Sequence, residues 1–576
     1  MCSMTADVTT DVLVVGSGAA GMYAALAAAR NNADTILVDK SLIGRGGATI
    51  MAQMTVAAAV SEQEPDHWTH HLRDTLDSGR GLCNEELAAI LCEEAPIRIR
   101  ELDDWKIGWA REDNHMKQVM APGHGRERCV YVDFLNTGPA VARTLRTQVG
   151  RAGNLRRASE LSITNIVVND GQVMGAVGLS MATGTPVTIQ AKAVVLAAGG
   201  LTRLYRRNSA SVNMGGDSYA LALRAGAELI DMEFVQFFPI GHLAPRLVGM
   251  DPIMWDPFRY KLGGRLLNSE GDEFVHNYGH LETSDKYTAP RDVASFAILQ
   301  EVAAGRGSPA GGAYLSFEHI PENTLRAAFG PVIDRLAAND IDLTRRGIEV
   351  SPIAHYHMGG VRVNSNMETS VPGLFVAGEA VGGANGANRL SGNALSEAFV
   401  FGERAGRFAA AAIDKRANLW SHDATRLAVD EITAGRHVAA RQSGPGLAGM
   451  LVTLQKLMWK DVGLLRTANN LTSARTLVRD MRRDIGNHPG ASDHRFAISM
   501  QDWFDIRNSL ITAEAIIAGA QTRTESRGAH QRDDFPRTDP EQTYNLITRL
   551  DGEDLSVTKA PLVSKSFDLI PLEAAE

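Results

Sequence analysis

Three glycines near the start of the chain have the spacing of a dinucleotide-binding turn. Gly16, Gly18 and Gly21 follow a short apolar run and form a GxGxxG pattern. In such a turn the first glycine allows a sharp bend, the second lets backbone N–H groups approach a pyrophosphate, and the third lets the next helix pack closely on the strand. Asp39 ends the following apolar run, where a carboxylate can hold an adenosine ribose through its hydroxyls. This stretch therefore predicts a dinucleotide-binding βαβ unit.

Two other groups of reactive side chains do not complete a site. His67, His70 and His71 lie together in HWTHH, but no nearby Cys or carboxylate arrangement completes a metal site, so we expect a helix start at the surface. The four cysteines include no CxxC pair, which argues against a chain-borne iron–sulfur cluster, a structural zinc or a disulfide framework and suits a reducing compartment. We therefore predict no metal site.

The bulk composition limits the classes of function. At 576 residues the chain should contain two to four structural units. Its net charge of -9 is spread without long acidic or basic runs, which gives no footprint for nucleic acid. No cationic leader precedes the first strand and no run of about 18 apolar residues follows, so we expect a soluble cytoplasmic protein without a membrane span.

The elements that must position these residues come in an interrupted order. The βα texture of the first part is lost between about 237 and 349, where Pro, Gly, Trp and Tyr are interspersed, and this predicts an inserted domain. An apolar strand at 373–378 then feeds a second glycine-rich turn and a helix. The pattern from about 416 to 517 is helical. The chain thus leaves its dinucleotide-binding domain and returns to it.

Several separated motifs resemble the flavoprotein subunits of succinate dehydrogenase and fumarate reductase, with L-aspartate oxidase as a cousin. Over residues 8–545 these motifs are VVGSGAAG, TIMAQ, AAGG, GGD before ALRAGAEL, PRDVA, HYHMGG, PGLFVAGE, GANRLSGNALSEAFVFG and RTESRGAHQRDDFP. The resemblance implies an α/β fold, in which a Rossmann-like FAD-binding domain carries an inserted α+β capping domain and a helical C-terminal domain. The expected boundaries are 1–240 and 355–415 for the FAD-binding domain, 241–354 for the capping domain, 416–545 for the helical domain and 546–576 for a tail.

The family implies FAD as the cofactor. By resemblance, the ADP half would be held by Gly16, Ser17, Gly18, Ala19, Ala20, Gly21, Asp39 and Lys40. The ribityl and isoalloxazine portions would be held by Thr49, Gln53, Asp217, Glu379, Ala394 and Leu395, with close-approach turns at Gly47, Ala198 and Gly199. Respiratory members have a histidine that bonds covalently to the flavin, and Ala48 occupies that position here. We therefore predict non-covalent FAD.

The family reaction moves a hydride between flavin N5 and one carbon, and a proton to or from its neighbour, beside a carboxylate. Such chemistry needs cations to polarise the carboxylate and a positioned acid. By resemblance, Arg291 in PRDVA is the proton donor or acceptor, and His355 and Arg389 grip the substrate carboxylate. Asp256 and Arg259 match the relay that resupplies the proton to Arg291.

The other end of the substrate site departs from the family. Relatives have His and Thr donors for a second carboxylate where this chain has Phe238 and Trp255. A buried carboxylate without donors is strongly disfavoured. Fumarate and succinate are therefore doubtful substrates unless His242 reaches the site, and a monocarboxylate with an apolar or aromatic remainder fits better.

Three hypotheses compete at this point. The first is an FAD-dependent oxidoreductase of the C–C bond beside a carboxylate. The second is an amino-acid or hydroxy-acid oxidase of the aspartate oxidase type, and the third is a non-catalytic flavoprotein that transfers electrons. Without clusters of its own, the chain would need an external electron carrier, which could be an iron–sulfur protein.

Overall fold

The structure is a computed structural model that divides the chain into two compact units. The first unit comprises residues 1–206, 210–235 and 356–576, and the second comprises 207–209 and 236–355. The second unit resembles the predicted inserted domain, whereas the helical C-terminal segment belongs to the first unit. The structure describes residues 6–133, 135–209, 211–247, 252–255, 259, 262–278, 291–330, 332–415, 420–434, 446–486, 489 and 497–567, and only the backbone of 291 and 292.

A seven-stranded sheet forms the centre of the first unit. Its hydrogen-bonded path runs β8-β2-β1-β11-β10-β9, and β18 also pairs with β11. The pairs β8–β2, β2–β1, β1–β11 and β11–β18 are parallel, whereas β10 is antiparallel to both β11 and β9. The strands are β1 Val8–Val15, β2 Thr35–Val38, β8 Leu155–Ala158, β9 Leu161–Asn169, β10 Gln172–Ser180, β11 Pro186–Leu196 and β18 Leu374–Val376.

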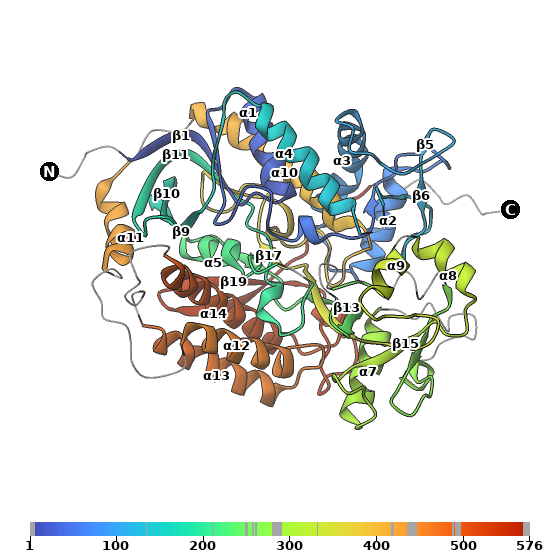
Figure 1. The fold of residues 1–576 in the computed structure, drawn as a ribbon. Helices are drawn as coiled ribbons and strands as arrows, with labels where there is room; N and C mark the ends of the chain where they lie inside the picture. The colour runs from blue at the N-terminus through green and yellow to red at the C-terminus, as the bar shows by residue number, and fades with distance from the viewer. Residues whose placement is uncertain are drawn as a thin grey trace. The chain divides into compact units, whose positions relative to one another are not determined.

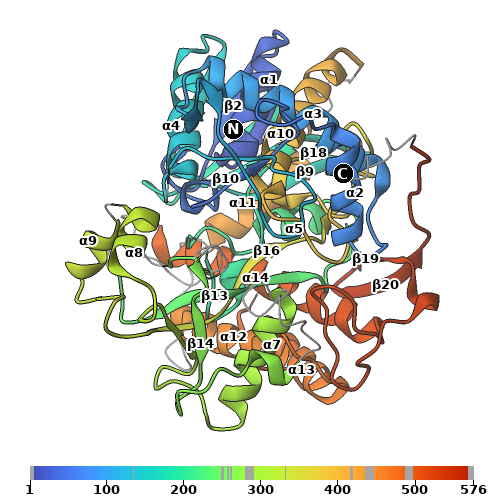
Figure 2. The same ribbon diagram turned by 90° about the vertical axis from the view of Figure 1, so that its right-hand side faces the viewer.

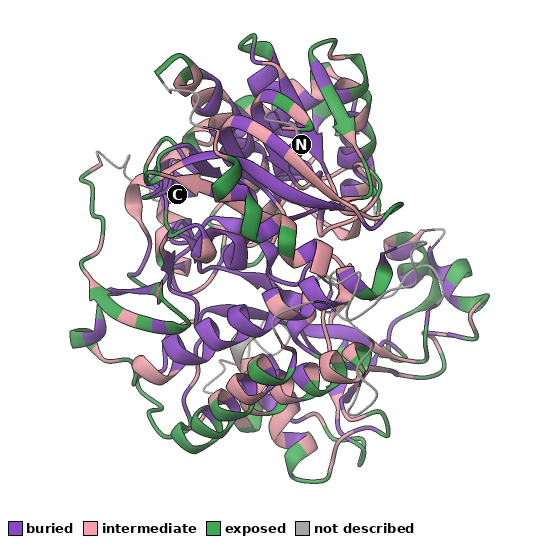
Figure 3. Ribbon diagram, turned by 90° about the vertical axis from the view of Figure 1, so that its left-hand side faces the viewer, coloured by how far each residue is buried: buried purple, intermediate pink, exposed green. Residues whose placement is uncertain are grey.

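Small residues allow two long helices to pack closely beside this sheet. Helix α1 (Ala19–Arg30) is rich in alanine and packs against α10 (Asn393–Ala412), as Figure 1 shows, with α4 (Thr137–Arg151) next to α1. A Cβ added at Gly406 would lie 2.0 Å from the carbonyl oxygen of Ala24. The contact therefore depends on a glycine, and the central strands are almost entirely buried (Figure 3).

The C-terminal part of the first unit consists of a group of helices and a small sheet. C-terminal helices α12, α13 and α14 pack on one another, and strand β19 pairs with β12 and with β20 (Figure 2). The segment that we expected as a tail thus contributes two strands. The elements are α2 Trp68–Ser78, α3 Glu85–Asp104, α5 Asp217–Arg224, α11 His422–Ala434, α12 Leu447–Asp461, α13 Ala468–Asp484, α14 Ile498–Thr522, β3 Val56–Ala57, β4 Arg111–Glu112, β5 His115–Met116, β6 Gln118–Val119, β7 Cys129–Val130, β12 Leu229–Ile230, β17 Gly360–Val361, β19 Asn545–Asp551 and β20 Asp554–Ala560.

The second unit is built on a four-stranded sheet of order β13-β16-β15-β14. Trp255, Phe317 and Phe329 form an aromatic cluster in its core, with ring centroids 5.9 to 6.2 Å apart. Mixed strands and helices of this kind agree with the predicted α+β insertion. The elements are β13 Val235–Ala244, β14 Arg265–Leu267, β15 Ala313–Ser316, β16 Ile348–His357, α7 Arg291–Ala303, α8 Glu322–Phe329 and α9 Val332–Ala337.

Candidate functional site

The glycine turn between β1 and α1 has the geometry that its spacing predicts. Gly16 has a φ of 99°, and a Cβ there would lie 2.4 Å from the carbonyl oxygen of Ala197. A Cβ at Gly21 would lie 1.8 Å from the carbonyl oxygen of Gly16. At Gly18, by contrast, an added Cβ would meet only the Thr49 hydroxyl, at 3.4 Å. Gly16 and Gly21 are therefore needed for packing, whereas Gly18 leaves space beside the backbone.

The N-terminus of α1 is suited to an anion. Its N-cap residue Gly18 has no side chain to cap the helix, and the N–H of Ala19 donates to Thr49 Oγ1 at 2.9 Å. The Ser17 N–H and hydroxyl donate to Asp39 at 2.8 and 2.6 Å, so Asp39 braces the turn from the end of β2. The N-terminus of a 12-residue helix that has no side-chain cap at its N-cap residue attracts negative charge. The residues present therefore fit the pyrophosphate of FAD.

Lys40 and Asp217 form one buried ion cluster with Asp505 from α14. The Lys40 ammonium donates to Asp217 at 2.7 Å and to Asp505 at 3.0 Å, and Asn508 donates to Asp217 at 2.8 Å. The two carboxylates raise the pKa of Lys40, although burial opposes the shift. Residues that the resemblance assigned to different portions of FAD are thus in direct contact, and a C-terminal helix braces both.

Glu379, one of the predicted flavin-side residues, lies in a second glycine-rich turn. Glu379 lies in the 3-10 helix that follows β18, and its side chain faces Gly200, where a Cβ would lie 2.3 Å from the carboxylate. Burial raises the pKa of Glu379 to about 8, while the N–H of His357 donates to its carboxylate at 3.2 Å. Ala198 donates its N–H to Ser218, and a Cβ at Gly47 would meet no atom within 4 Å.

The start of α10 presents a second helix end without a side-chain cap. Gly392 is the N-cap residue, and Ala394 and Leu395 lie in the first turn. The backbone N–H groups at such an end favour a ligand atom that carries negative charge. This is the property expected of residues that contact the polar edge of a flavin.

The loop that carries Arg389 is fixed by one buried and one partly buried histidine. His71 Nε2 donates to Asn393 Oδ1 at 2.8 Å, and His124 Nε2 donates to the carbonyl oxygen of Ser391 at 2.7 Å. Burial lowers the pKa of His71 to about 3 and that of His124 to about 4, so both rings stay neutral near pH 7. The predicted surface position of the HWTHH cluster is therefore wrong for His70 and His71, because both are buried side chains of α2.

Arg389 itself is almost buried. Its side chain is 5% exposed, and Nη1 donates to the carbonyl oxygen of Leu390 at 3.1 Å. A guanidinium taken out of water in this way must be compensated by neighbouring groups. The two histidine contacts, at Ser391 and Asn393, follow Arg389 directly in the chain and hold the loop close to it.

In the second unit, His355 is held by two neighbours. Its Nδ1 lies 2.8 Å from the Ser209 hydroxyl, and its ring centroid lies 5.4 Å from that of Phe238 in an edge-on arrangement. Ser209 comes from the short segment 207–209 that joins this unit separately. Phe238 also packs with Met254 and Ile353. An apolar ring therefore lies beside His355.

Trp255 and His242 interact with each other. The Trp255 indole N–H donates to His242 Nδ1 at 3.1 Å, and His242 Nε2 donates to the carbonyl oxygen of Pro245 at 2.5 Å. The side chain of Trp255 is completely buried in the aromatic cluster described above. Both ring nitrogens of His242 are thus engaged within the unit, which argues against its reaching a substrate carboxylate.

The proposed proton relay is described only in part. Arg291 is the first residue of α7, but its side chain lies outside the described residues, as does the whole of Asp256. Arg259 is described and is 2% exposed, with its N–H bonded to the carbonyl oxygen of Trp255. Gln53 is partly buried at the end of the loop after Thr49. The roles of these residues stay predictions.

A buried carboxylate near Arg389 should make the stability of the FAD-free protein fall as pH rises. Burial raises the pKa of Glu397 to about 7, although Tyr356, Asn385 and Arg389 favour its charged form. The folded chain therefore keeps a proton that the unfolded chain loses near pH 4, and this contribution is present below that pH and lost by about pH 7. We expect wild type to lose about 3 kcal/mol relative to Glu397→Gln between pH 4.5 and 8. Urea titrations at both pH values measure this, and parallel losses in both proteins would contradict it.

Two features are absent from the described part of the chain. No group of three or more His, Cys, Asp or Glu residues there has an arrangement that could hold a metal ion. None of the helices in the described ranges combines the length and the apolar character that a membrane crossing requires.

Family profiles, relatives and solved structures match this chain. A family profile described as FAD binding domain matches residues 11–395, and one described as Fumarate reductase flavoprotein C-term matches 452–573. One subunit of the Fumarate reductase (CoM/CoB) of Methanothermobacter marburgensis is 35% identical over 543 residues, or 93% of this chain and 96% of that protein. L-aspartate oxidase of a Nostoc species is 30% identical over 94% of this chain and 93% of its own length. The Mycobacterium smegmatis Sdh1 structure with UQ1 has a TM-score of 0.87 at 32% identity, covering 97% of this chain and 95% of its own.

Proposed function

Because the chain belongs to the family of FAD-dependent fumarate reductase and succinate dehydrogenase flavoproteins, we propose that it reduces or forms a C–C double bond next to a carboxylate. When bound, FAD supplies hydride exchange at its N5. The observation that carries the proposal is Arg389, a nearly buried guanidinium in a loop that two neutral histidines hold in place. A fixed arginine can orient a carboxylate through two parallel hydrogen bonds.

The remaining roles follow from the family motifs. Arg389 and His355 bind the substrate carboxylate, and Arg291 gives a proton to the neighbouring carbon or takes one from it. Arg259 and Asp256 return that proton to Arg291. The hydrogen bond between Ser209 and His355 Nδ1 supports this scheme, because it fixes the orientation of the imidazole.

The substrate that we propose is a monocarboxylate with an apolar or aromatic remainder. Phe238 lies beside His355, and Trp255 uses its indole N–H on His242. Neither residue can replace the His and Thr donors with which relatives bind a second carboxylate. A dicarboxylate would therefore lose hydrogen bonds worth several kcal/mol, whereas an apolar group would be accepted.

An anaerobic reoxidation screen tests the proposed function. The flavin is bleached with a reduced viologen dye and then mixed with unsaturated acids. We expect cinnamate or a similar monocarboxylate to restore the yellow colour faster than fumarate does. Persistent bleaching with every acid in the panel would favour the non-catalytic electron-transfer alternative.

We also propose that FAD is held without a covalent bond. Ala48, at the N-cap of the short helix Thr49–Met51, has no side chain that could bond to the flavin. Acid precipitation should therefore release all of the yellow colour into the supernatant. Flavin that stays in the protein pellet and fluoresces on a denaturing gel would contradict this prediction.

An oxidase reaction is the second candidate, because the similarity to an L-aspartate oxidase extends over 94% of this chain. In that case oxygen would reoxidise the flavin after oxidation of an amino acid or a hydroxy acid. Release of hydrogen peroxide on aerobic mixing with L-aspartate, or with an apolar amino acid, would favour this activity over the first.

The electron carrier that we propose is a separate protein with iron–sulfur clusters. The similar protein of Methanothermobacter marburgensis is named as one of the subunits of its enzyme, which supports an assembly of more than one chain. Co-purification of this protein from its own cells, followed by iron and sulfide analysis of the partner, tests this proposal.

A further inference from the structure

Tyr356 lies directly under the guanidinium of Arg389. The Arg389 Cζ is 4.5 Å from the centroid of the Tyr356 ring, and both side chains are at most 5% exposed. Contact with a ring face stabilises a desolvated cation and does not use its N–H donors, which lie in the guanidinium plane. The ring can therefore support Arg389 while its donors point elsewhere.

The hydroxyl of Tyr356 is anchored at its far end. It donates to Glu397 Oε2 at 2.6 Å, and Asn385 Nδ2 donates to the same oxygen at 2.6 Å. Glu397 is 1% exposed, and Asn393, the partner of His71, donates to Asn385 at 3.4 Å. A ring held by hydrogen bonds at one end and packing on its faces has little freedom to tilt.

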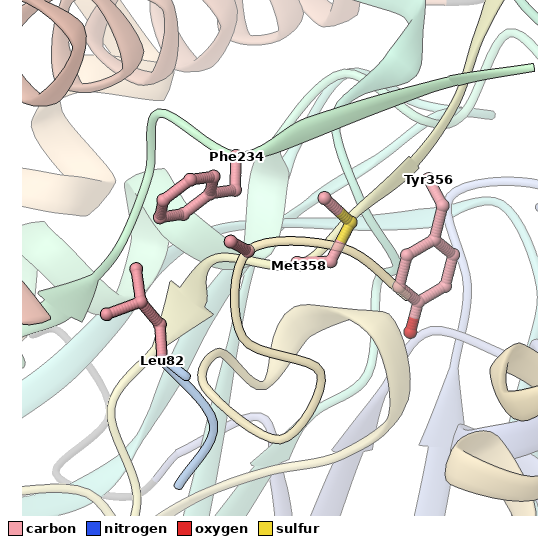
Figure 4. Packing of buried hydrophobic residues seen from close by; sticks show 5 residues of the cluster. Leu82, Phe234, Tyr356 and Met358 are labelled. Carbon is pink, nitrogen blue, oxygen red and sulfur yellow. The ribbon is translucent and has the colours of Figure 1, made fainter. Parts of the chain in front are cut away.

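The hydrophobic side of Tyr356 is fixed as well. It belongs to a buried cluster with Leu82, Phe234, Met358 and Ala387, and Figure 4 shows it at one edge of this cluster, beyond Met358. Ordinary core packing would place a tyrosine there without a carboxylate at its hydroxyl. A buried carboxylate is costly in such surroundings, and the two hydrogen bonds to Glu397 Oε2 offset part of that cost and fix the Tyr356 hydroxyl.

We propose that Tyr356, anchored by Glu397, is a positioning residue that sets the angle at which Arg389 presents its donors to the substrate carboxylate. This inference rests on the proposed function, because it assigns Arg389 to that carboxylate. Tyr356 touches neither the substrate nor the reacting atoms in this role. It acts only through Arg389.

Binding of cinnamate to the oxidised holoenzyme tests the proposal, since no electrons are available and no turnover occurs. The dissociation constant is read from the change in the flavin absorbance spectrum. We expect Tyr356→Leu to weaken binding about tenfold, because it removes the ring beneath the cation. Tyr356→Phe keeps the ring but loses the anchor, and should weaken binding by a smaller factor.

A matched control separates positioning from general destabilisation. Tyr205→Leu removes another fully buried tyrosine of the first unit, whose hydroxyl bonds to the carbonyl oxygen of Val462 rather than to the Arg389 loop. It should lower the melting temperature and leave the cinnamate affinity unchanged. If Tyr356→Leu binds cinnamate as tightly as Tyr205→Leu does, the positioning role is wrong.

Arg389→Gln distinguishes a failure of the proposed function from a failure of the positioning role of Tyr356. We expect this variant to lose cinnamate binding while it retains FAD. If it binds cinnamate like wild type, or if wild type itself shows no spectral change with cinnamate, the proposed function fails and this inference fails with it. If Arg389→Gln loses binding and Tyr356→Leu does not, only the inference is overturned.

Discussion

Replacement of Arg291 by glutamine should leave the flavin bound and lower turnover by about 10²- to 10⁴-fold, the range expected for loss of a general acid or base. Glutamine keeps a polar side chain of similar length, but it cannot donate or accept the proton that accompanies hydride transfer. Arg291 is the first residue of α7, where a change of side chain breaks no backbone hydrogen bond of the helix. The folded state and the FAD content should therefore be preserved.

Steady-state assays with the acid found in the reoxidation screen measure this effect. Arg265→Gln is a suitable control, because Arg265 lies on β14 of the same unit and forms an exposed ion pair with Glu273. That variant should retain wild-type turnover. Wild-type kcat in Arg291→Gln, with its FAD content confirmed by absorbance, would remove Arg291 from the reaction.

The second large effect is expected from Gly18→Ala, which should keep the fold but weaken FAD binding about 5- to 150-fold, the factor that corresponds to a steric cost of about 1–3 kcal/mol. Gly18 has φ -66° and ψ -175°, a conformation that alanine also adopts. The new methyl group would meet only Thr49 Oγ1, at an ordinary contact distance of 3.4 Å. It would, however, occupy the space through which a pyrophosphate approaches the helix end.

Titration of the FAD-free protein with FAD, followed by flavin fluorescence, gives the affinity. Gly153→Ala is a matched control, since a Cβ there meets no atom within 4 Å. Gly21→Ala should instead prevent folding, because its Cβ would collide with the carbonyl oxygen of Gly16. An unchanged FAD affinity in Gly18→Ala would place the pyrophosphate away from this turn.

Local features of the fold could be predicted well from the sequence. The helix expected after the glycine turn is α1, and Asp39 directly follows β2, as its spacing indicates. Asn169-Asp170-Gly171 has the composition of a hairpin turn, and it lies between β9 and β10, where Asp170 and Gly171 have positive φ values. These successes share one cause: short-range backbone geometry depends on residue types that are adjacent in the chain.

Contacts between distant segments could not be predicted in the same way. His71 reads as part of a polar helix start, and only the fold brings Asn393 to its ring. The strand pair β19–β20 reads as a turn-rich tail, because its partner β12 lies more than 300 residues earlier. Periodicity carries no information about such partners, so tertiary structure had to supply them.

In the candidate site, too, the residues could be predicted from the sequence but the contacts between them could not. Tyr356 lies in the motif HYHMGG and Glu397 lies in GANRLSGNALSEAFVFG, so the sequence points to both residues. Their hydrogen bond, however, connects two separate motifs, and neither motif alone predicts it. Ser209 lies outside the motifs quoted for the family, and its bond to His355 has no counterpart in the sequence pattern. The motifs therefore indicate which residues take part, and the structure adds how they support one another.

The ion cluster around Lys40 has a consequence for biosynthesis. Its partner Asp505 follows 465 positions later in the chain, and strand β1 is flanked by β11, which in turn pairs with β18. During translation, these early segments cannot form their native contacts until the ribosome has synthesised the partner residues. Nascent chains that stop short of α14 lack this brace, so we expect acquisition of the prosthetic group to be essentially post-translational.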